Sequence, residues 1–348
     1  MSSLKSRIVQ YSTPLIDGNQ VTFVWEGEVA PGLAGDFNGW DTDKPVAMSE
    51  SEPGMWTYST TFERDAYIEY VFIVDGEREL DPHNPRTLWN GMEDLQNYFR
   101  MPDSKPDPYL RRVPGLKTRG TIIEESLDLD IYVADGRRTA FLYKPHTDEP
   151  VPLICVYDGR DYLRRASIAN VVDNLIAAGK IRPVALVMPD NGKSARMIEY
   201  FANDLTVGMM LIHMFAFARK HLTLIDETVQ PGIHGVLGAS MGGLMALWSG
   251  IRVPHIFGHV IAQSSGVEWD YGGTEMPLVQ LIRLKDKLPI KIWQDVGKYE
   301  WLLERNRRLN ELLREKGYDV MYREFSAGHN FTAWADQLAD ALIYQYGV

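Results

Sequence analysis

The chain has 348 residues, of which 45% are hydrophobic and 11% aromatic, and its formal net charge at pH 7 is -11. This length exceeds a usual single core, so two domains with the composition of an ordinary globular protein are expected. Residues 1–101 hold 7 of the 36 Lys and Arg residues but 17 of the 47 Asp and Glu residues, which argues against nucleic-acid binding through that part.

The N-terminus and the cysteine content bear on where the protein works. Residues 1–10 are polar and contain no apolar run of the kind that a signal peptide needs. No stretch of about 18 apolar residues occurs, so no membrane span is predicted. Cys155 is the only cysteine, lies in an apolar run, and is interpreted as a core residue. These features predict a cytoplasmic protein, and they leave its oligomeric state open.

The first third of the chain alternates apolar and polar residues as β-strands do. Strands are predicted over 21–25, 55–62 and 68–74, with turn-rich segments such as 35–40 between them. Short strands at this spacing predict an all-β, immunoglobulin-like sandwich, which we assign to residues 1–101. Three prolines within residues 101–108 indicate a linker, assigned to residues 102–112.

From residue 113 to residue 348 the pattern changes to strands that alternate with helices. The strands are predicted over 120–127, 138–143, 153–157, 184–188, 233–237, 259–262, 290–295 and 320–325. The helices are predicted over 168–178, 205–221, 244–251, 301–316 and 332–346. Two early strands without a helix, followed by β/α alternation, predict a doubly wound, mostly parallel sheet with helices on both faces. The fold class is therefore α/β, preceded by the all-β domain.

The most informative motif is Gly-x-Ser-x-Gly around Ser240, because of the segments on either side of it. An apolar run closed by glycine precedes the motif, and an apolar helix is predicted to follow it. A serine on such a sharp strand-to-helix turn has a strained backbone that holds its hydroxyl out from the sheet. Ser240 is accordingly the predicted nucleophile.

A serine nucleophile needs a base within hydrogen-bonding reach and an acid that orients the base. In α/β-hydrolases the chain order is Ser, then Asp or Glu, then His. Five of the eight histidines precede Ser240, and two more follow it too closely, which leaves His329 as the base. The acid should follow the penultimate strand, where Asp295 and Glu300 compete, and spacing alone does not choose between them.

The transition state also needs donors for its developing negative charge. The backbone N–H of Met241 is the first, and the loop after the third strand of the catalytic domain should supply the second. There Asp158 and Gly159 form a predicted tight turn that aims the N–H of Arg160 inward. Basic residues gather on the same loops, Arg196 among them, and are compatible with an anionic substrate.

These residues together resemble the enterochelin esterase family, the cytoplasmic enzymes that hydrolyse ferric siderophore esters. The resemblance covers nearly the whole chain and includes the segments 81–85, 158–159, 196–203, 238–244, 264–266, 297–300 and 328–329. It implies an α/β-hydrolase fold with an N-terminal early-set sandwich, and the Gly297-x-x-Glu300 match moves the acid assignment to Glu300, with Asp295 as runner-up. Asp158, Gly159 and Arg196 become candidate substrate-binding residues.

The resemblance implies a serine ester hydrolase that needs no metal or cofactor and acts on a small-molecule ester, with an anionic ferric siderophore as first choice. One segment departs from it, because residues 35–40 are closer to the loop of glycogen-binding early-set modules. A carbohydrate esterase with a glycan-binding sandwich is thus an alternative, in which Trp40 or Trp56 stacks on sugar. The interpretation of these tryptophans as core residues is favoured. A non-catalytic binding protein on the same fold is a further alternative.

Overall fold

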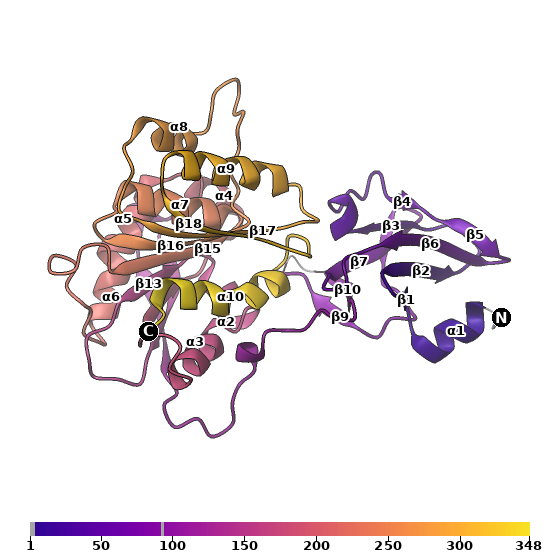
Figure 1. The fold of residues 1–348 in the computed structure, drawn as a ribbon, viewed down its shortest axis with the longest axis horizontal. Helices are drawn as coiled ribbons and strands as arrows, with labels where there is room; N and C mark the ends of the chain where they lie inside the picture. The colour runs from indigo at the N-terminus through magenta and orange to yellow at the C-terminus, as the bar shows by residue number, and fades with distance from the viewer. Residues whose placement is uncertain (1–3, 92–93) are drawn as a thin grey trace. The chain divides into compact units, whose positions relative to one another are not determined.

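The computed structural model of the protein describes residues 4–91 and 94–348 (Figure 1). The chain forms two compact units. The first joins the residues up to Pro106 with two short segments from much later in the chain, Gly297–Trp301 and Glu324–Ala333. The second contains Asp107–Val296, Leu302–Arg323 and Trp334–Val348, and so begins inside the range expected as a linker.

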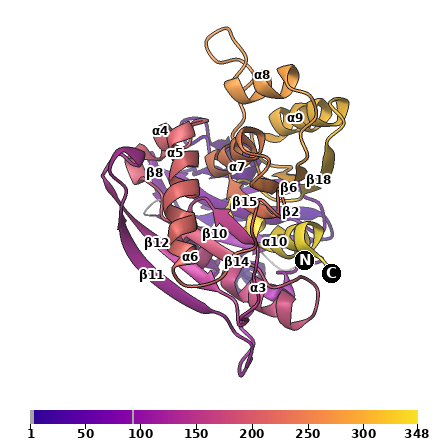
Figure 2. The ribbon, with the colours of Figure 1, turned by 90° about the vertical axis from the view of Figure 1, so that its left-hand side faces the viewer.

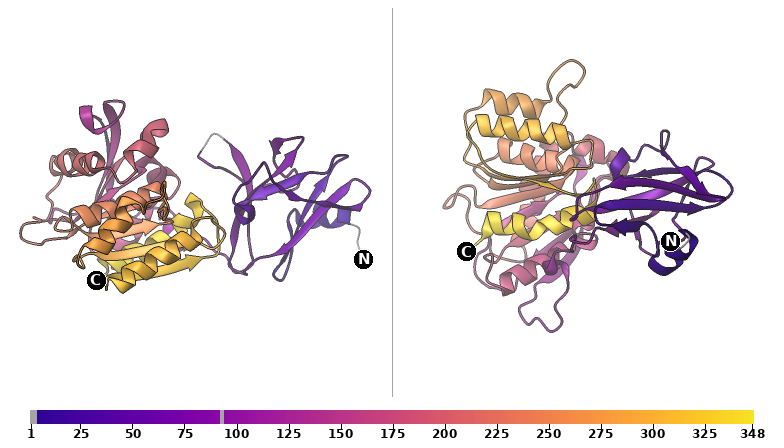
Figure 3. Two further views of the ribbon diagram at one scale, coloured as in Figure 1. Left: turned by 90° about the horizontal axis from the view of Figure 1, so that it is seen from above. Right: turned by 45° about the vertical axis from the view of Figure 1, so that its right-hand side comes forward.

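The first unit is all-β apart from one helix and a short turn of 3₁₀ helix. Its four-stranded sheet has the order β1-β2-β6-β5, and its six-stranded sheet follows the path β4-β3-β7-β10-β9 with β8 paired to β7. The bounds are α1 Leu4–Tyr11, β1 Leu15–Asp17, β2 Gln20–Glu26, β3 Gly32–Gly35, η1 Asp36–Asn38, β4 Val46–Ala47, β5 Ser49–Glu52, β6 Met55–Thr61, β7 Tyr67–Val74, β8 Glu77–Glu79, β9 Thr87–Trp89 and β10 Leu95–Arg100. The pairings between these named strands are antiparallel, and Figure 3 shows the unit from two further sides.

Aromatic side chains from both sheets fill the core of this unit. Phe23 lies on β2, while Tyr70 and Phe72 lie on β7, and all three are fully buried in one cluster. Phe23 and Tyr70 pack edge to face with their centroids 4.9 Å apart, which is a favourable arrangement for two aromatic rings. The two sheets therefore share one apolar core, as the alternating pattern predicts.

The second unit is built on an eight-stranded sheet in the order β11-β12-β14-β13-β15-β16-β17-β18. The strands are β11 Thr121–Asp128, β12 Arg137–Lys144, β13 Leu153–Val156, β14 Ala185–Pro189, β15 His234–Ala239, β16 Phe257–Gln263, β17 Lys291–Gly297 and β18 Asp319–Phe325. Pairings that involve β11 and β12 are antiparallel, and those from β14 through β13, β15 and β16 to β17 are parallel. All eight predicted strands are present, and Figure 2 shows β11, β12 and β14 side by side.

Helices cover both faces of this sheet, since its central strands are apolar on both sides. Figure 1 shows α7 (Met241–Arg252), α8 (Pro277–Leu284) and α9 (Leu303–Glu315) on one side, and α3 (Ile168–Ala177) and α10 (Phe331–Tyr346) on the other. The predicted helix over 205–221 is a continuous helical segment: α5 Asp204–Met209, a π-turn Met210–Met214 and α6 Phe215–Arg219. The pattern analysis missed α8 and the short α2 (Gly159–Arg164) and α4 (Arg196–Glu199).

No single helix within the described ranges is both long and apolar enough to cross a membrane. A bent pair, Lys193–Glu199 with Asp204–Arg219, meets the length and composition only when its halves are joined. Cys155 is fully buried in the central sheet, and burial raises the pKa of its thiol, in keeping with a core residue.

Candidate active site

Ser240 occupies the one-residue turn between β15, which ends at Ala239, and α7, which begins at Met241. Its backbone has φ 58° and ψ -123°, a region that a residue with a side chain rarely adopts. The N–H of Ser240 donates to the carbonyl of Gln263 at 2.9 Å, and its own carbonyl accepts the N–H of Gly266 at 2.8 Å. The end of β16 and the loop after it therefore hold the strained turn from both sides.

Close backbone approach explains the glycine before Ser240. A Cβ added at Gly238 would lie 2.3 Å from the carbonyl oxygen of Gly242, far inside van der Waals contact. The carbonyl oxygen of Gly242 is a backbone atom and cannot rotate out of the way. The strand and the helix could therefore not keep their separation with any larger residue at position 238. The motif read from the sequence thus has its predicted strand-to-helix geometry.

The predicted base and acid meet in a hydrogen bond. Nδ1 of His329, in the loop after β18, lies 2.6 Å from Oε2 of Glu300, in the loop after β17. The other carboxylate oxygen of Glu300 accepts the backbone N–H of Gly297 at 2.5 Å. Because a carboxylate oxygen accepts, this hydrogen bond places a proton on Nδ1 of the imidazole. The indole of Trp301 lies over the imidazole, with ring centroids 4.7 Å apart.

Asp295, the runner-up for the acid, forms hydrogen bonds inside the sheet. Its Oδ2 accepts hydrogen bonds from Nε1 of Trp293 at 2.7 Å and from Nε2 of Gln263 at 3.1 Å. Asp295 is fully buried on β17 and holds two neighbouring strands together at this point. The structure therefore places Glu300 next to the imidazole and gives Asp295 separate partners.

The turn that carries Arg160 differs from the predicted one in which residue makes it. Asp158 adopts the left-handed conformation, with φ 56°, and α2 begins directly after it at Gly159. Gly159 is required for a different reason, since an added Cβ would lie 2.3 Å from the backbone of Met188 on β14. Arg160 is then the second residue of α2, and Met241 is the first residue of α7. The backbone N–H groups of such residues have no acceptor within their own helix.

The two arginines expected near the substrate are engaged in ion pairs. Arg196 donates to both carboxylate oxygens of Asp158 at 2.6 and 2.7 Å, and Arg160 donates to Asp190 at 2.5 Å. The carboxylate of Asp158 also accepts Nδ2 of Asn191 at 2.9 Å. Both arginines are therefore paired with carboxylates, and the sequence analysis did not predict either pairing.

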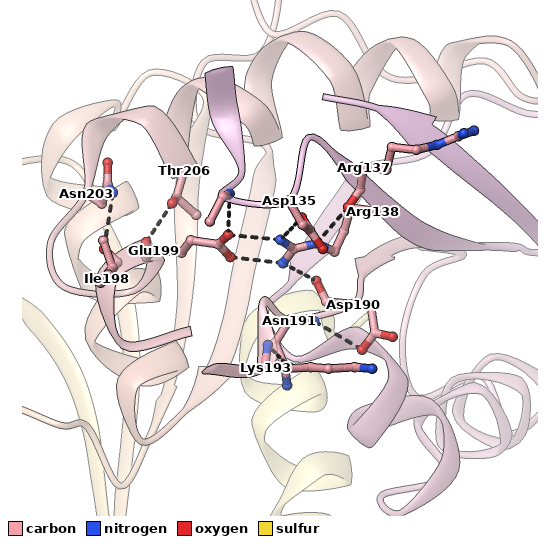
Figure 4. Close-up of polar contacts among 11 residues, drawn as sticks. Asp135, Arg137, Arg138, Asp190, Asn191, Lys193, Ile198, Glu199, Asn203 and Thr206 are labelled. Atoms are coloured by element: carbon pink, nitrogen blue, oxygen red, sulfur yellow. Dashed lines mark hydrogen bonds and ion pairs between the residues drawn. The ribbon is translucent and has the colours of Figure 1, made fainter. Parts of the chain in front are cut away.

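A buried ion pair anchors the segment that carries Arg196 (Figure 4). Arg138, on β12, donates from both terminal nitrogens to both oxygens of Glu199, each at 2.9 Å. Glu199 also accepts the backbone N–H of Ala134 at 3.0 Å, and both charged residues are almost completely buried. Sequence analysis placed Glu199 in a matching motif but missed Arg138. The feature of the sequence that could have identified Arg138 is its place directly after Arg137, at the start of a predicted strand, where alternation turns one of the two side chains inward.

The tryptophans considered for glycan stacking are half-buried. Nε1 of Trp40 donates to Asp36 at 3.1 Å, its ring packs against Ala34 and Val71, and the guanidinium of Arg78 lies over its face. Nε1 of Trp56 donates to the carbonyl of Gly27 at 3.0 Å. Both indoles are packed as core residues would be, which was the favoured interpretation.

Comparison with known proteins matches residues 133–345 to a family model described as "Putative esterase". The iron(III) enterobactin esterase of Dickeya dadantii is 27% identical over 227 residues, which are 59% of this chain and 51% of that protein. The chain thus spans about half the length of such curated relatives. The solved structure of the ferric enterobactin esterase of Salmonella typhimurium has a TM-score of 0.78 at 18% identity and covers 96% of this chain and 95% of that one. A ferulic acid esterase structure has a TM-score of 0.55 at 17% identity and covers 66% of this chain and 99% of that one.

Proposed function

The chain belongs to the Esterase family, and we propose that it is a serine carboxylic-ester hydrolase with Ser240 as nucleophile, His329 as base and Glu300 as the orienting acid. The observation that carries the proposal is the backbone of Ser240 at φ 58° on the turn from β15 to α7. A strained conformation of this kind persists only where the surrounding structure enforces it. In hydrolases, a turn of this kind presents the hydroxyl of the nucleophilic serine. The Glu300–His329 hydrogen bond supports the same reading.

In the proposed reaction, Oγ of Ser240 attacks the ester carbonyl while Nε2 of His329 removes its proton. Glu300 holds the imidazole in the tautomer with its proton on Nδ1, and stabilises the imidazolium that forms. The tetrahedral intermediate collapses as His329 returns the proton to the departing alcohol, which leaves an acyl-enzyme on Ser240. A water molecule, deprotonated by His329, then releases the acid and restores Ser240.

We assign the stabilisation of the oxyanion to the backbone N–H groups of Met241 and Arg160. Each residue lies in the first turn of its helix, where the N–H groups project beyond the helix end and the helix dipole favours negative charge. Loss of one such donor typically lowers turnover by about 100- to 1,000-fold. The backbone of Arg160 depends on the left-handed residue two positions before it, Asp158, and therefore on the ion pair between Asp158 and Arg196.

For the substrate we propose a siderophore-type ester such as a trilactone. Similarity of fold to the ferric enterobactin esterase extends over 96% of the chain, the all-β unit included, whereas similarity to the ferulic acid esterase covers 66%. Arg160 and Arg196 each keep guanidinium N–H groups beyond those in their ion pairs, since an arginine has five donors, and these could bind an anionic group. The cytoplasmic location stays a prediction.

The decisive experiment compares wild-type protein with Ser240→Ala in a hydrolysis screen of siderophore trilactones, feruloyl esters, acetyl esters and p-nitrophenyl esters. We expect Ser240→Ala to lower kcat by about 10,000-fold or more, because the nucleophile and its base act as one unit. We expect the wild-type protein to prefer the trilactones, and we expect a fluorophosphonate probe to label Ser240.

Ser249→Ala is the matched control, since Ser249 is a fully buried serine on α7, the helix that follows Ser240, and its hydroxyl contacts that of Tyr157. It should retain wild-type kcat. Full activity in Ser240→Ala would refute the mechanism. Absence of both labelling and hydrolysis in the wild-type protein would favour the non-catalytic alternative, and a preference for acetyl or feruloyl esters would favour the carbohydrate esterase.

A further inference from the structure

Asp36 belongs to the segment that resembled a glycan-binding loop, yet it is buried inside the first unit. Its side chain and backbone are 1% exposed. Oδ1 accepts Nε1 of Trp40 at 3.1 Å, and Oδ2 accepts the backbone N–H of Glu69 at 2.9 Å. The carboxyl group therefore points into the unit, toward the backbone of β7, where a sugar would not reach it.

Asp36 also contacts the residues on both sides of His329. Nδ2 of Asn330 lies 3.4 Å from Oδ2 of Asp36. On the other side, a Cβ added at Gly328 would lie 2.1 Å from Cγ of Asp36, so only a glycine leaves room for the carboxyl. His329 lies between these two contacts, and its own side chain reaches Glu300.

Strand β7 holds the same loop through its backbone. The N–H of Tyr67 donates to the carbonyl of Ser326 at 2.9 Å, and Tyr67 forms a parallel bridge with Ala327. The hydroxyl of Tyr67 donates to Glu69 at 2.7 Å and lies 3.3 Å from the hydroxyl of Thr332. The loop that carries His329 is therefore attached to the sandwich before and after the histidine.

The charges around Asp36 favour its neutral form. Burial raises the pKa of Asp36 well above its usual range, and the nearby carboxylates of Glu69 and Glu300 raise it further. Hydrogen bonds from Glu69 and Trp40 oppose this rise. A neutral carboxyl can fill this space without placing another negative charge beside the Glu300–His329 pair.

From this packing we propose that Asp36 is a positioning residue for His329, which sets the backbone of residues 328–330 and thereby the direction of the imidazole. The role rests on the proposed ester hydrolysis, in which His329 is the base. It assigns to the all-β unit a part in the reaction, through a residue whose motif had pointed to sugar binding.

The first test replaces Asp36 by Ala and uses Asp81→Ala as matched control. Asp81 is equally buried in the same sandwich and accepts hydrogen bonds from Thr13, Tyr70 and His83, away from residues 324–333. Both variants should lower the melting temperature. Only Asp36→Ala should lower kcat, by about 10- to 100-fold with KM unchanged, because displacement of the base by about 1 Å costs turnover rather than binding.

The second test is a double-mutant cycle. Gly328→Ala should lower kcat, because its new methyl group collides with Asp36, and Asp36→Gly removes the atoms that it would hit. The double variant should therefore be more active than Gly328→Ala alone. Equal loss of kcat in Asp36→Ala and Asp81→Ala, or a double variant no more active than Gly328→Ala, would overturn the proposal.

Failure of this inference is distinguishable from failure of the proposed function. Dependence of hydrolysis on Ser240 tests the mechanism and is unaffected by the outcome for Asp36. A readout that needs no activity is the NMR signal of the proton on Nδ1 of His329, identified by its loss in His329→Asn. We expect this signal to shift or broaden in Asp36→Ala and to stay in place in Asp81→Ala, and an unchanged signal in both variants would refute the positioning role.

Discussion

At the scale of single residues, the choice between Glu300 and Asp295 shows where sequence reasoning ended. Chain order selects one histidine, because only His329 follows the nucleophile at a suitable distance. Spacing could not select the acid, since one carboxylate lies near the end of the strand and the other lies just after it. The choice depends on a loop that returns Glu300 toward the imidazole, with a hydrogen bond from Gly297 that holds its second oxygen.

We expect Glu300→Gln to lower kcat by about 1,000- to 10,000-fold, because an amide no longer fixes the tautomer or stabilises the imidazolium. Steady-state kinetics at saturating ester measures this. Asp295→Asn keeps the shape of a buried side chain that bonds Trp293 and Gln263, so its loss of kcat should be smaller and its loss of stability larger. The reverse ranking of kcat values would reassign the acid to Asp295.

At the scale of elements, the segment with α4 depends on the pair between Arg138 and Glu199. Both side chains are less than a tenth exposed. Arg138 also pairs with Asp135 at 2.9 Å, whereas removal of Arg138 would leave Glu199 as a buried charge without its cation. The same segment carries Arg196, whose ion pair fixes Asp158. The conformation of the candidate oxyanion turn is thus linked to a strand, β12, that lies at a distance from it in the sequence.

Arg138→Ala should lower the free energy of unfolding by about 3–5 kcal/mol, because it leaves the charge of Glu199 buried without its cation. Urea unfolding at neutral pH measures this loss. The matched control is Arg137→Ala, which removes the partner of Asp128 in a pair whose side chains are 66% and 82% exposed. That change should cost about 0–1 kcal/mol. Equal losses in the two variants would show that the buried pair between Arg138 and Glu199 stabilises the fold no more than the exposed pair does.

Strand β7 shows how far patterns predict an element. The alternation over residues 68–74 predicted the strand correctly, since Ile68, Tyr70 and Phe72 face the sandwich core. Seven of its eight residues are nevertheless buried, on both faces. The backbone of Tyr67, at the start of the strand, also pairs with Ser326 and Ala327, more than 250 positions later in the chain. Periodicity reports local environment, so it could not reveal a partner so remote in sequence.

At the scale of the whole molecule, buried histidines should make stability depend on pH. Burial lowers the pKa of His234, whose Nδ1 accepts the backbone N–H of Leu153 at 2.9 Å. Above the unfolded pKa of about 6.5 the imidazole is neutral in both states. As the pH falls below that value, the unfolded chain takes up a proton that the folded chain does not, so stability is lost.

We expect His234→Gln to flatten the decline in the free energy of unfolding between about pH 7.5 and pH 5.5, as urea titrations at several pH values would show. The exposed His255 provides the control, and His255→Gln should leave the slope unchanged. Asp36 acts in the opposite direction, since its raised pKa adds stability as the pH falls, so variants are compared with the wild type at each pH. An unaltered slope in His234→Gln would contradict the prediction.

The composition of the first unit has a consequence for chimeric proteins. A chimera that is cut in the predicted linker, residues 102–112, would transfer the sandwich without segments 297–301 and 324–333, which belong to the same compact unit. A foreign sandwich would then face Gly328 without Asp36, and the native one would meet an unfamiliar loop. Recombination libraries drawn from this family should therefore inherit three stretches of sequence as a single block.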